Sequence, residues 1–177
     1  MNLLAIGHPF LKAYNQEKYV AVKQLGLTVR LLMTSHARDR FEFSSYEVHP
    51  ALARDEVAPL KSWFELSHLG HLHNPWGIAA TLRNFQPHVI HMGEEPHALI
   101  TVETLALQRT LAPRARLSLF SWDNPLRPWH FPLNTRKNRS RAYSLRRVAA
   151  VHRGNHQAAE LLRAEGRFAG DIEVLPQ

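Results

Sequence analysis

Two short apolar runs separated by one helical segment constrain the fold of this chain most strongly. Leu3–Gly7 is apolar and runs into His-Pro, and Leu27–Met33 is the second apolar run. Between them, Tyr14–Leu25 carries apolar residues at helical spacing, and Gly26 is placed to end a helix. A strand, a helix and a strand in so short a segment predict a βαβ unit, which requires a parallel sheet and a right-handed crossover.

The same alternation continues along the rest of the sequence. Pro87–Met92 is predicted to be a buried strand, and His97–Leu111 a helix with one apolar face. Further strands are predicted at Phe41–Val48, Ser62–Leu72, Ala115–Ser121, Val148–Val151 and Ile172–Leu175, and further helices at Trp76–Phe85, Arg136–Arg147 and Asn155–Glu165. We therefore expect an α/β fold in one domain over residues 1–177: a Rossmann-like, doubly wound, mostly parallel sheet with helices on both faces.

The composition is that of an ordinary globular domain. The chain has 177 residues, 45% of them hydrophobic and 21% charged, which is enough for one hydrophobic core. It has no cysteine, so disulfides, thiolate metal ligands and a cysteine nucleophile are excluded. No apolar stretch approaches the roughly 20 residues of a membrane span. The first residues lack the basic leader of a signal peptide, so we expect a cytoplasmic location.

The net charge of +7 favours an anionic partner. No acidic residue occurs from Asn124 to Ala159, and Arg136–Arg147 is a strongly basic helix. Two readings fit this pattern: a solvated basic face, or a surface that docks at the inner face of an anionic membrane or binds a phosphate. Nucleic acid is not expected as a partner, because the segment has no known recognition motif.

Familiar enzyme and metal motifs are missing. The sequence has no G-x-G-x-x-G after its first strand, no P-loop and no G-x-S-x-G. The spacing of His68, His71 and His73 matches no standard zinc pattern. We therefore expect neither a metal site nor a cofactor.

The carboxyl ends of the strands are where a doubly wound sheet binds its ligand. This rule selects the loops at residues 8–12, 93–96, 122–124 and 152–155. The residues expected to contact a sugar or an acceptor are His8, Phe10, Lys12, Glu94, Glu95, Trp122, Asn124 and Arg153. Glu94 and Glu95 are expected between the end of a buried strand and the first turn of a helix, whose N-terminus stabilises a negative charge by about 0.3–1 kcal/mol. A simple acidic N-cap is the alternative reading of the same pair.

The second half of the chain resembles a known family. His88–Pro96 is similar to the strand and Glu-Glu-Pro loop of retaining GT-B glycosyltransferases of the family 4 type. Ser121–Asn124, Ala149–Arg163 and Ile172–Gln177 resemble three segments that follow in that family in the same order. The resemblance covers nearly the whole chain and is clearest over Pro87–Gln177.

This resemblance implies a function as well as a fold. It implies the N-terminal, acceptor-side half of an enzyme that transfers a sugar from a nucleotide-sugar donor to a hydroxyl of a glycolipid or polysaccharide, with retention and without a metal. In that family a second domain binds the donor. We expect that domain to be absent from these 177 residues and the chain to be inactive alone. Glu94 stands where many relatives have a histidine, and it is the best catalytic candidate, without an assigned acid or base role.

Three alternatives from other classes stay open at this point. The chain fits a stand-alone binding module, or a subunit that complements a separate donor domain. It also fits a nucleic-acid-binding protein that uses the basic segment 127–153, if salt-dependent binding were found. Finally, it fits a Rossmann-like enzyme of another kind, such as a sugar-phosphate epimerase with a nucleotide at the loop of residues 7–12.

Overall fold

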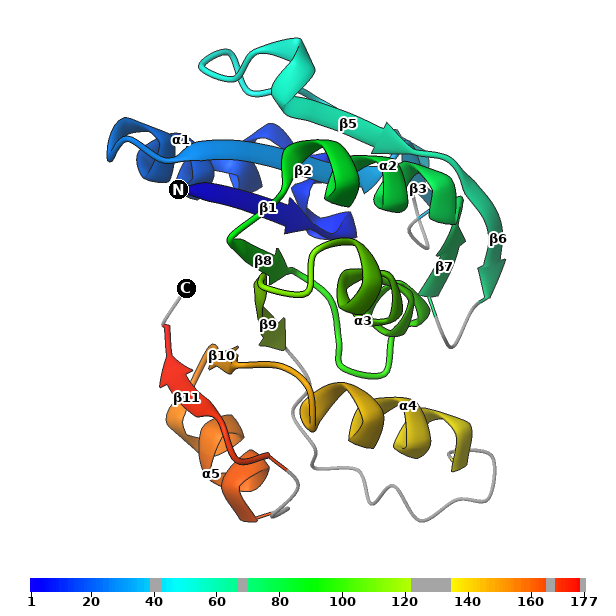
Figure 1. The fold of residues 1–177 in the computed structure, drawn as a ribbon, viewed down its shortest axis with the longest axis vertical. Helices are drawn as coiled ribbons and strands as arrows, with labels where there is room; N and C mark the ends of the chain where they lie inside the picture. The colour runs from blue at the N-terminus through cyan, green and yellow to red at the C-terminus, as the bar shows by residue number, and fades with distance from the viewer. Residues whose placement is uncertain (39–42, 67–69, 122–134, 165–167, 176–177) are drawn as a thin grey trace.

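One parallel sheet forms the centre of the molecule. The structure is a computed structural model that describes residues 1–38, 43–66, 70–121, 135–164 and 168–175. Seven strands pair in the order β11-β10-β9-β8-β1-β2-β5, and all neighbours are parallel. They are β1 (Asn2–Ile6), β2 (Thr28–Thr34), β5 (Val57–Leu60), β8 (Val89–Met92), β9 (Arg116–Ser121), β10 (Ala150–Arg153) and β11 (Asp171–Val174). Figure 1 shows them in this order from β5 at the top to β11 at the bottom.

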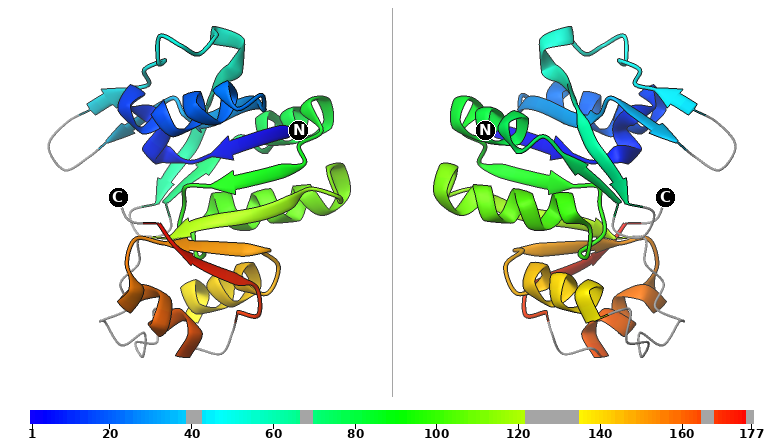
Figure 2. Two further views of the ribbon diagram at one scale, coloured as in Figure 1. Left: turned by 90° about the vertical axis from the view of Figure 1, so that its left-hand side faces the viewer. Right: turned by 90° about the vertical axis from the view of Figure 1, so that its right-hand side faces the viewer.

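Five α-helices and two small hairpins surround the sheet in the described part of the chain. The helices are α1 (Glu17–Gln24), α2 (Pro75–Phe85), α3 (Leu99–Leu111), α4 (Thr135–Leu145) and α5 (His156–Ala164). Short 3-10 turns are η1 (His8–Leu11), η2 (Ala13–Gln16) and η3 (Arg54–Glu56). The hairpins pair β3 (His36–Arg38) with β4 (Phe43–Ser45), and β6 (Ser62–Leu66) with β7 (Gly70–His73). Figure 2 shows α4 and α5 beside the β10–β11 end of the sheet.

The two faces of the sheet carry separate hydrophobic cores. Along β1, Leu4 and Ile6 belong to one cluster while Leu3 and Ala5 belong to the other, because side chains alternate along a strand. Each of the helices α2, α3, α4 and α5 contributes at least one buried residue to the first cluster. Among the described helices, only α1 contributes to the second, through Tyr19. Four helices therefore cover one face, and α1 covers the β1–β2 part of the other.

The predicted fold class is confirmed. The first strand, helix and strand form the expected βαβ unit, and β1 pairs in parallel with both β2 and β8. Helices lie on both faces of the sheet, as the alternation of elements predicted. No helix in the described residues is long and apolar enough to cross a membrane.

Local differences from the predicted elements have physical reasons. The α-helix expected from Tyr14 begins at Glu17 instead, because the residues before it form the 3-10 turn η2, whose Gln16 side chain donates to the carbonyl oxygens of Phe10 and Glu47. The single strand expected at Ser62–Leu72 is instead the antiparallel pair β6–β7. Sequence patterns did not predict β5, because it contains a proline. A sheet tolerates proline at its edge, and β5 is an edge strand.

Candidate functional site

The carboxyl ends of four adjacent strands bring distant parts of the sequence together. β1, β8, β9 and β10 are neighbours and run in parallel, so their last residues lie along one edge. His8 follows β1, Glu94 and Glu95 follow β8, and Ser121 and Arg153 end β9 and β10. Three of the four predicted loops thus meet at this edge, which we call the candidate site. The fourth, 122–124, lies outside the described residues.

The loops after β1 and β8 pack closely against each other. A Cβ atom on Gly7 would lie 3.0 Å from the Gly93 carbonyl oxygen, and one on Gly93 would lie 2.5 Å from the Phe10 ring. Phe10 is only 1% exposed, and its ring meets that of Tyr19 edge-on at 5.0 Å between centroids. Phe10 is therefore a core residue that fixes the glycine before Glu94. This corrects the expectation that its ring faces a ligand.

Glu94 is held by the loop that follows the first strand. Its Oε1 accepts a hydrogen bond from the backbone N–H of His8 at 2.6 Å and lies 2.8 Å from His8 Nδ1. The Glu94 side chain is 10% exposed, whereas that of His8 is 53% exposed. A carboxylate fixed in this way keeps its second oxygen as an acceptor for a hydroxyl group.

The two glutamates precede the helix, as predicted, but they lie further from its first turn than the sequence indicated. α3 begins at Leu99, and its N-cap is Ala98, which has no side-chain cap. Instead, the Glu95 carbonyl oxygen accepts bonds from Ala98 N–H at 2.9 Å and from Thr101 Oγ1 at 3.0 Å. Since the dipole effect fades within the first turn, hydrogen bonds from the neighbouring strand ends, and not the helix, are what hold these carboxylates.

Glu95 is joined to a buried arginine through one hydroxyl. Ser121 Oγ donates to Glu95 Oε2 at 2.6 Å and accepts from Arg153 Nη1 at 2.9 Å. Arg153 has no exposed surface, and Ser121 is 1% exposed. A buried guanidinium needs such compensation, because desolvation of an isolated charge is very costly. The positive charge of Arg153 thus lies one hydroxyl away from the negative charge of Glu95.

The comparison with known proteins agrees with the fold. The model of the "Glycosyl transferase 4-like domain" family matches residues 11–177. The chain belongs to this family. No curated protein matches the sequence.

In this glycosyl transferase 4-like domain, the two carboxylates of the candidate site change the pKa of His8. Partial burial lowers the pKa of His8, but the hydrogen bond to Glu94 and the negative charges of Glu94 and Glu95 act the other way. The net effect raises the pKa of His8 above its ordinary value of 6.5. His8 therefore gains a proton more readily here than in water, which neutralises part of the charge of the two carboxylates.

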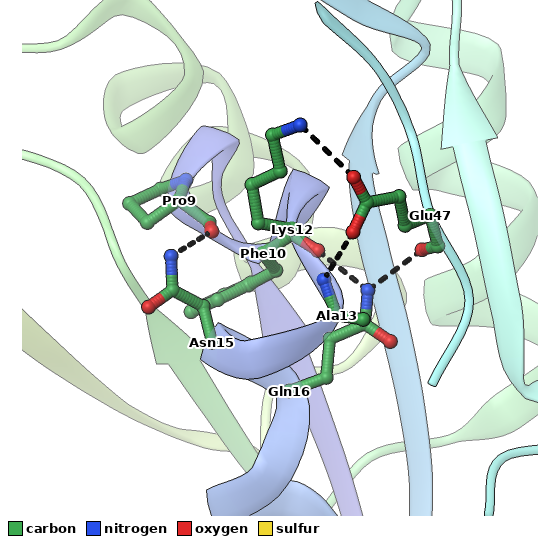
Figure 3. A network of polar contacts seen from close by, with 7 residues as sticks. All are labelled: Pro9, Phe10, Lys12, Ala13, Asn15, Gln16 and Glu47. Atoms are coloured by element: carbon green, nitrogen blue, oxygen red, sulfur yellow. Dashed lines mark hydrogen bonds and ion pairs between the residues drawn. The ribbon is translucent and has the colours of Figure 1, made fainter. Parts of the chain in front are cut away.

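Lys12 lies in the first loop but is engaged by another segment. Its Nζ lies 2.9 Å from Glu47 Oε1, and Ala13 N–H donates to Glu47 Oε2 at 3.1 Å. The hydrogen bond from Lys12, followed by that from Ala13, lowers the pKa of Glu47. Gln16 Nε2 bridges the carbonyl oxygens of Phe10 and Glu47 in the same network, which Figure 3 shows. Lys12 thus holds the first loop in place through its contact with Glu47.

The remaining predictions concern Trp122 and Asn124, the cap residue Asn155 and metal binding. Trp122 and Asn124 lie outside the described residues. Asn155 caps α5, as its position predicted, and its Oδ1 accepts from Ala158 N–H at 2.8 Å. No group of three or more metal-ligating side chains occurs among the described residues.

Sequence reasoning missed one residue of this edge and did not distinguish two aromatic rings of the first loop. Ser121 was placed at the end of a strand but not in the site, although the carboxyl-end rule selects that position. Tyr14 is 68% exposed in η2, where it is an aromatic ring available to solvent, unlike Phe10. Burial of an aromatic residue in so short a loop is decided by tertiary packing, so no local signal distinguished the two rings.

Proposed function

We propose that this domain is the acceptor-side half of a glycosyltransferase that moves a sugar from a nucleotide-sugar donor to a hydroxyl of a glycolipid or polysaccharide. One observation carries the proposal: two adjacent carboxylates are held at the carboxyl ends of the strands by partners that end or follow three other strands. Glu94 is held by His8, and Glu95 by Ser121 and, through it, Arg153. The family membership supports the same class of reaction.

The two carboxylates have different roles in this proposal. Glu94 uses one oxygen for His8 and presents the other to an acceptor or donor hydroxyl. Glu95 keeps its charge near the reacting carbon, where the transition state of glycosyl transfer is oxocarbenium-like and positive. Arg153 and Ser121 fix the position of Glu95, so that its charge does not reorient during the reaction.

Acceptor binding by the 177-residue chain tests the proposal. Methyl hexosides and a short glycolipid headgroup are titrated into the labelled chain, and amide shifts are followed by NMR. We expect shifts at residues 7–12 and 93–97 that weaken in Glu94→Gln and Glu95→Gln. Glu17→Gln, an exposed change on α1, is the matched control. Shifts that are equal in all four proteins would contradict the assignment of the site.

Transfer itself is expected to require a donor-binding domain. Incubation of the isolated chain with labelled nucleotide sugars and the same acceptors should give no product. If the isolated chain catalyses measurable transfer, the proposal of an acceptor-side half is wrong.

We also propose that α4 docks this domain on an anionic membrane. Its surface presents Arg139, and Arg146 and Arg147 follow its last turn, all three exposed. Arg141 does not contribute, because it is 2% exposed. Each basic residue near an anionic surface adds about 1 kcal/mol to membrane binding. The helix itself, Thr135–Leu145, contains no acidic residue to oppose this attraction.

Vesicle sedimentation tests the membrane proposal. The chain is mixed with phosphatidylcholine vesicles that contain or lack phosphatidylserine, at low and high salt. We expect binding only to the anionic vesicles, and its loss in Arg139→Gln/Arg146→Gln. Arg83→Gln/Arg109→Gln removes the same charge from exposed positions on α2 and α3 and should bind as well as the parent. Equal losses in both double variants would show a general charge effect and no specific role for α4.

A further inference from the structure

A cavity of about 400 Å³ lies on the face of the sheet that α1 covers only in part. Its floor is formed by side chains of β1, β8, β9 and β10, and its wall by α1. The volume falls in the range of roughly 300–1,000 Å³ that small-molecule sites occupy. Leu3, Val22, Val89 and Leu175 give it apolar surface. The cavity is lined by none of the residues proposed to bind a sugar.

A cation lies at this cavity, and none of the described residues forms an ion pair with it. Lys18 Nζ lies 5.3 Å from the ring centroid of Phe10, 5.4 Å from that of Tyr19 and 5.8 Å from that of Phe120. Partial desolvation lowers the pKa of Lys18, although part of the side chain is exposed. No aspartate or glutamate occurs among the residues that line the cavity. Aromatic faces stabilise the ammonium group but do not neutralise it.

The polar groups on the floor are neutral hydrogen-bonding side chains. His91 Nδ1 lies 3.1 Å from Ser118 Oγ, and the rings of His91 and His152 are 5.7 Å apart. Burial, then the charges of Lys18 and His152, lower the pKa of His91 to about 3, so His91 is neutral at pH 7. Burial also lowers the pKa of His152, against the influence of Glu173. Neutral imidazoles and a hydroxyl both donate and accept hydrogen bonds.

Tyr19 adds an aromatic ring to the wall of the cavity. It is 3% exposed, and its hydroxyl is buried out of reach of solvent, so the hydroxyl is not counted among the polar groups of the cavity. The cavity thus combines apolar walls, several polar groups and one cation, with no carboxylate among the residues that line it.

We propose that this cavity binds a small amphipathic organic anion. Its flat apolar body lies between α1 and the sheet, and its carboxylate or phosphate group lies at Lys18. A neutral sugar fits less well, since the walls are largely apolar and offer few partners for its many hydroxyls. Of the residues that line the cavity, only His152, next to Arg153, belongs to a loop of the candidate site, and the proposal does not depend on the transferase function.

Matched ligands that differ only in charge test this proposal. The chain is titrated with 2-naphthoate, 2-naphthyl phosphate and the neutral 2-naphthamide, and affinities are measured by calorimetry or NMR. The two anions report whether a carboxylate or a phosphate is preferred. We expect at least one anion to bind about tenfold more tightly than the amide, a difference of about 1.4 kcal/mol. Lys18→Met should remove this preference, whereas Lys61→Met, at an exposed lysine outside the cavity, should keep it.

A second variant tests the position of the ligand. Val22→Trp adds volume from the wall formed by α1 and should abolish binding of every probe, while circular dichroism and the melting temperature show that the chain is folded. Equal affinity for the anions and the amide, or a preference that Lys18→Met leaves intact, would overturn the proposal. So would anion binding that persists in folded Val22→Trp, or the failure of all three probes to bind at millimolar concentration.

Discussion

Arg153 Nη1 and Ser121 Oγ, 32 residues apart in the sequence, form a buried 2.9 Å hydrogen bond where β10 and β9 end. The same hydroxyl donates to Glu95 after β8, so one serine joins the ends of three adjacent strands. This relationship fixes a carboxylate of the candidate site and also stabilises the sheet edge. Its removal should therefore affect both stability and ligand binding.

Replacement of Ser121 tests this joint role. Ser121→Ala leaves Glu95 Oε2 and Arg153 Nη1 without their shared hydroxyl, and we expect the free energy of unfolding to fall by about 1–3 kcal/mol. Urea denaturation gives this value. Ser45→Ala, at an exposed serine of β4, should change stability by less than about 0.5 kcal/mol. A Ser121 variant as stable as the Ser45 variant would mean that the hydrogen bonds add nothing.

Close packing of the two site loops predicts a strong effect at Gly93. Gly93→Ala places a Cβ atom 2.5 Å from the buried Phe10 ring, and overpacking of this kind costs about 1–3 kcal/mol. Gly154→Ala is the matched control, because its Cβ would meet nothing within 4 Å. Thermal melts compare the two. Phe10→Leu should restore part of the stability lost in Gly93→Ala, and additive losses in the double variant would contradict direct contact.

His8 and Glu94 predict a pH dependence. The pKa of His8 is raised in the folded chain, so the folded state favours the protonated form. This contribution to stability is complete below the ordinary pKa of 6.5 and is lost as the pH rises through the higher folded pKa. An NMR titration of the His8 ring should show the raised pKa, and Glu94→Gln should lower it. An unchanged pKa in Glu94→Gln would contradict the pairing.

Glu103 on α3 predicts a pH dependence of the same sign in a lower pH range. Burial raises its pKa from 4.5 to about 7, and its Oε2 has no hydrogen-bond partner among the described residues. Because the folded state binds the proton more tightly, stability falls as the pH rises from 4.5 to about 7. After allowance for solvent screening, Glu103→Gln should be more stable than the parent by about 1–2 kcal/mol at pH 8.

Urea denaturation at two pH values checks this prediction. At pH 4, where the parent Glu103 is already protonated, the parent and Glu103→Gln should be equally stable. A constant difference between them at pH 4 and pH 8 would assign the effect to packing and not to ionisation.

The sequence determined which segments form the sheet and in what sense they run. Apolar runs such as Leu3–Gly7 and Pro87–Met92 are local patterns, and connecting helices leave only a parallel arrangement for the strands that they join. The loops at the strand ends, with Glu94 and Glu95, followed from the same rule. The edge strand Val57–Leu60 did not, because its proline obscures the pattern of a strand.

Only the tertiary structure decided which side chains meet at that edge. His8 and Glu94 are 86 residues apart, and Ser121 is 26 residues from Glu95, so their contacts depend on the order and register of strands that no local pattern specifies. The same holds for the burial of Phe10 beneath Gly93. Periodicity in a sequence reports the face on which a residue lies, whereas hydrogen bonding and burial depend on what the rest of the chain places against that face.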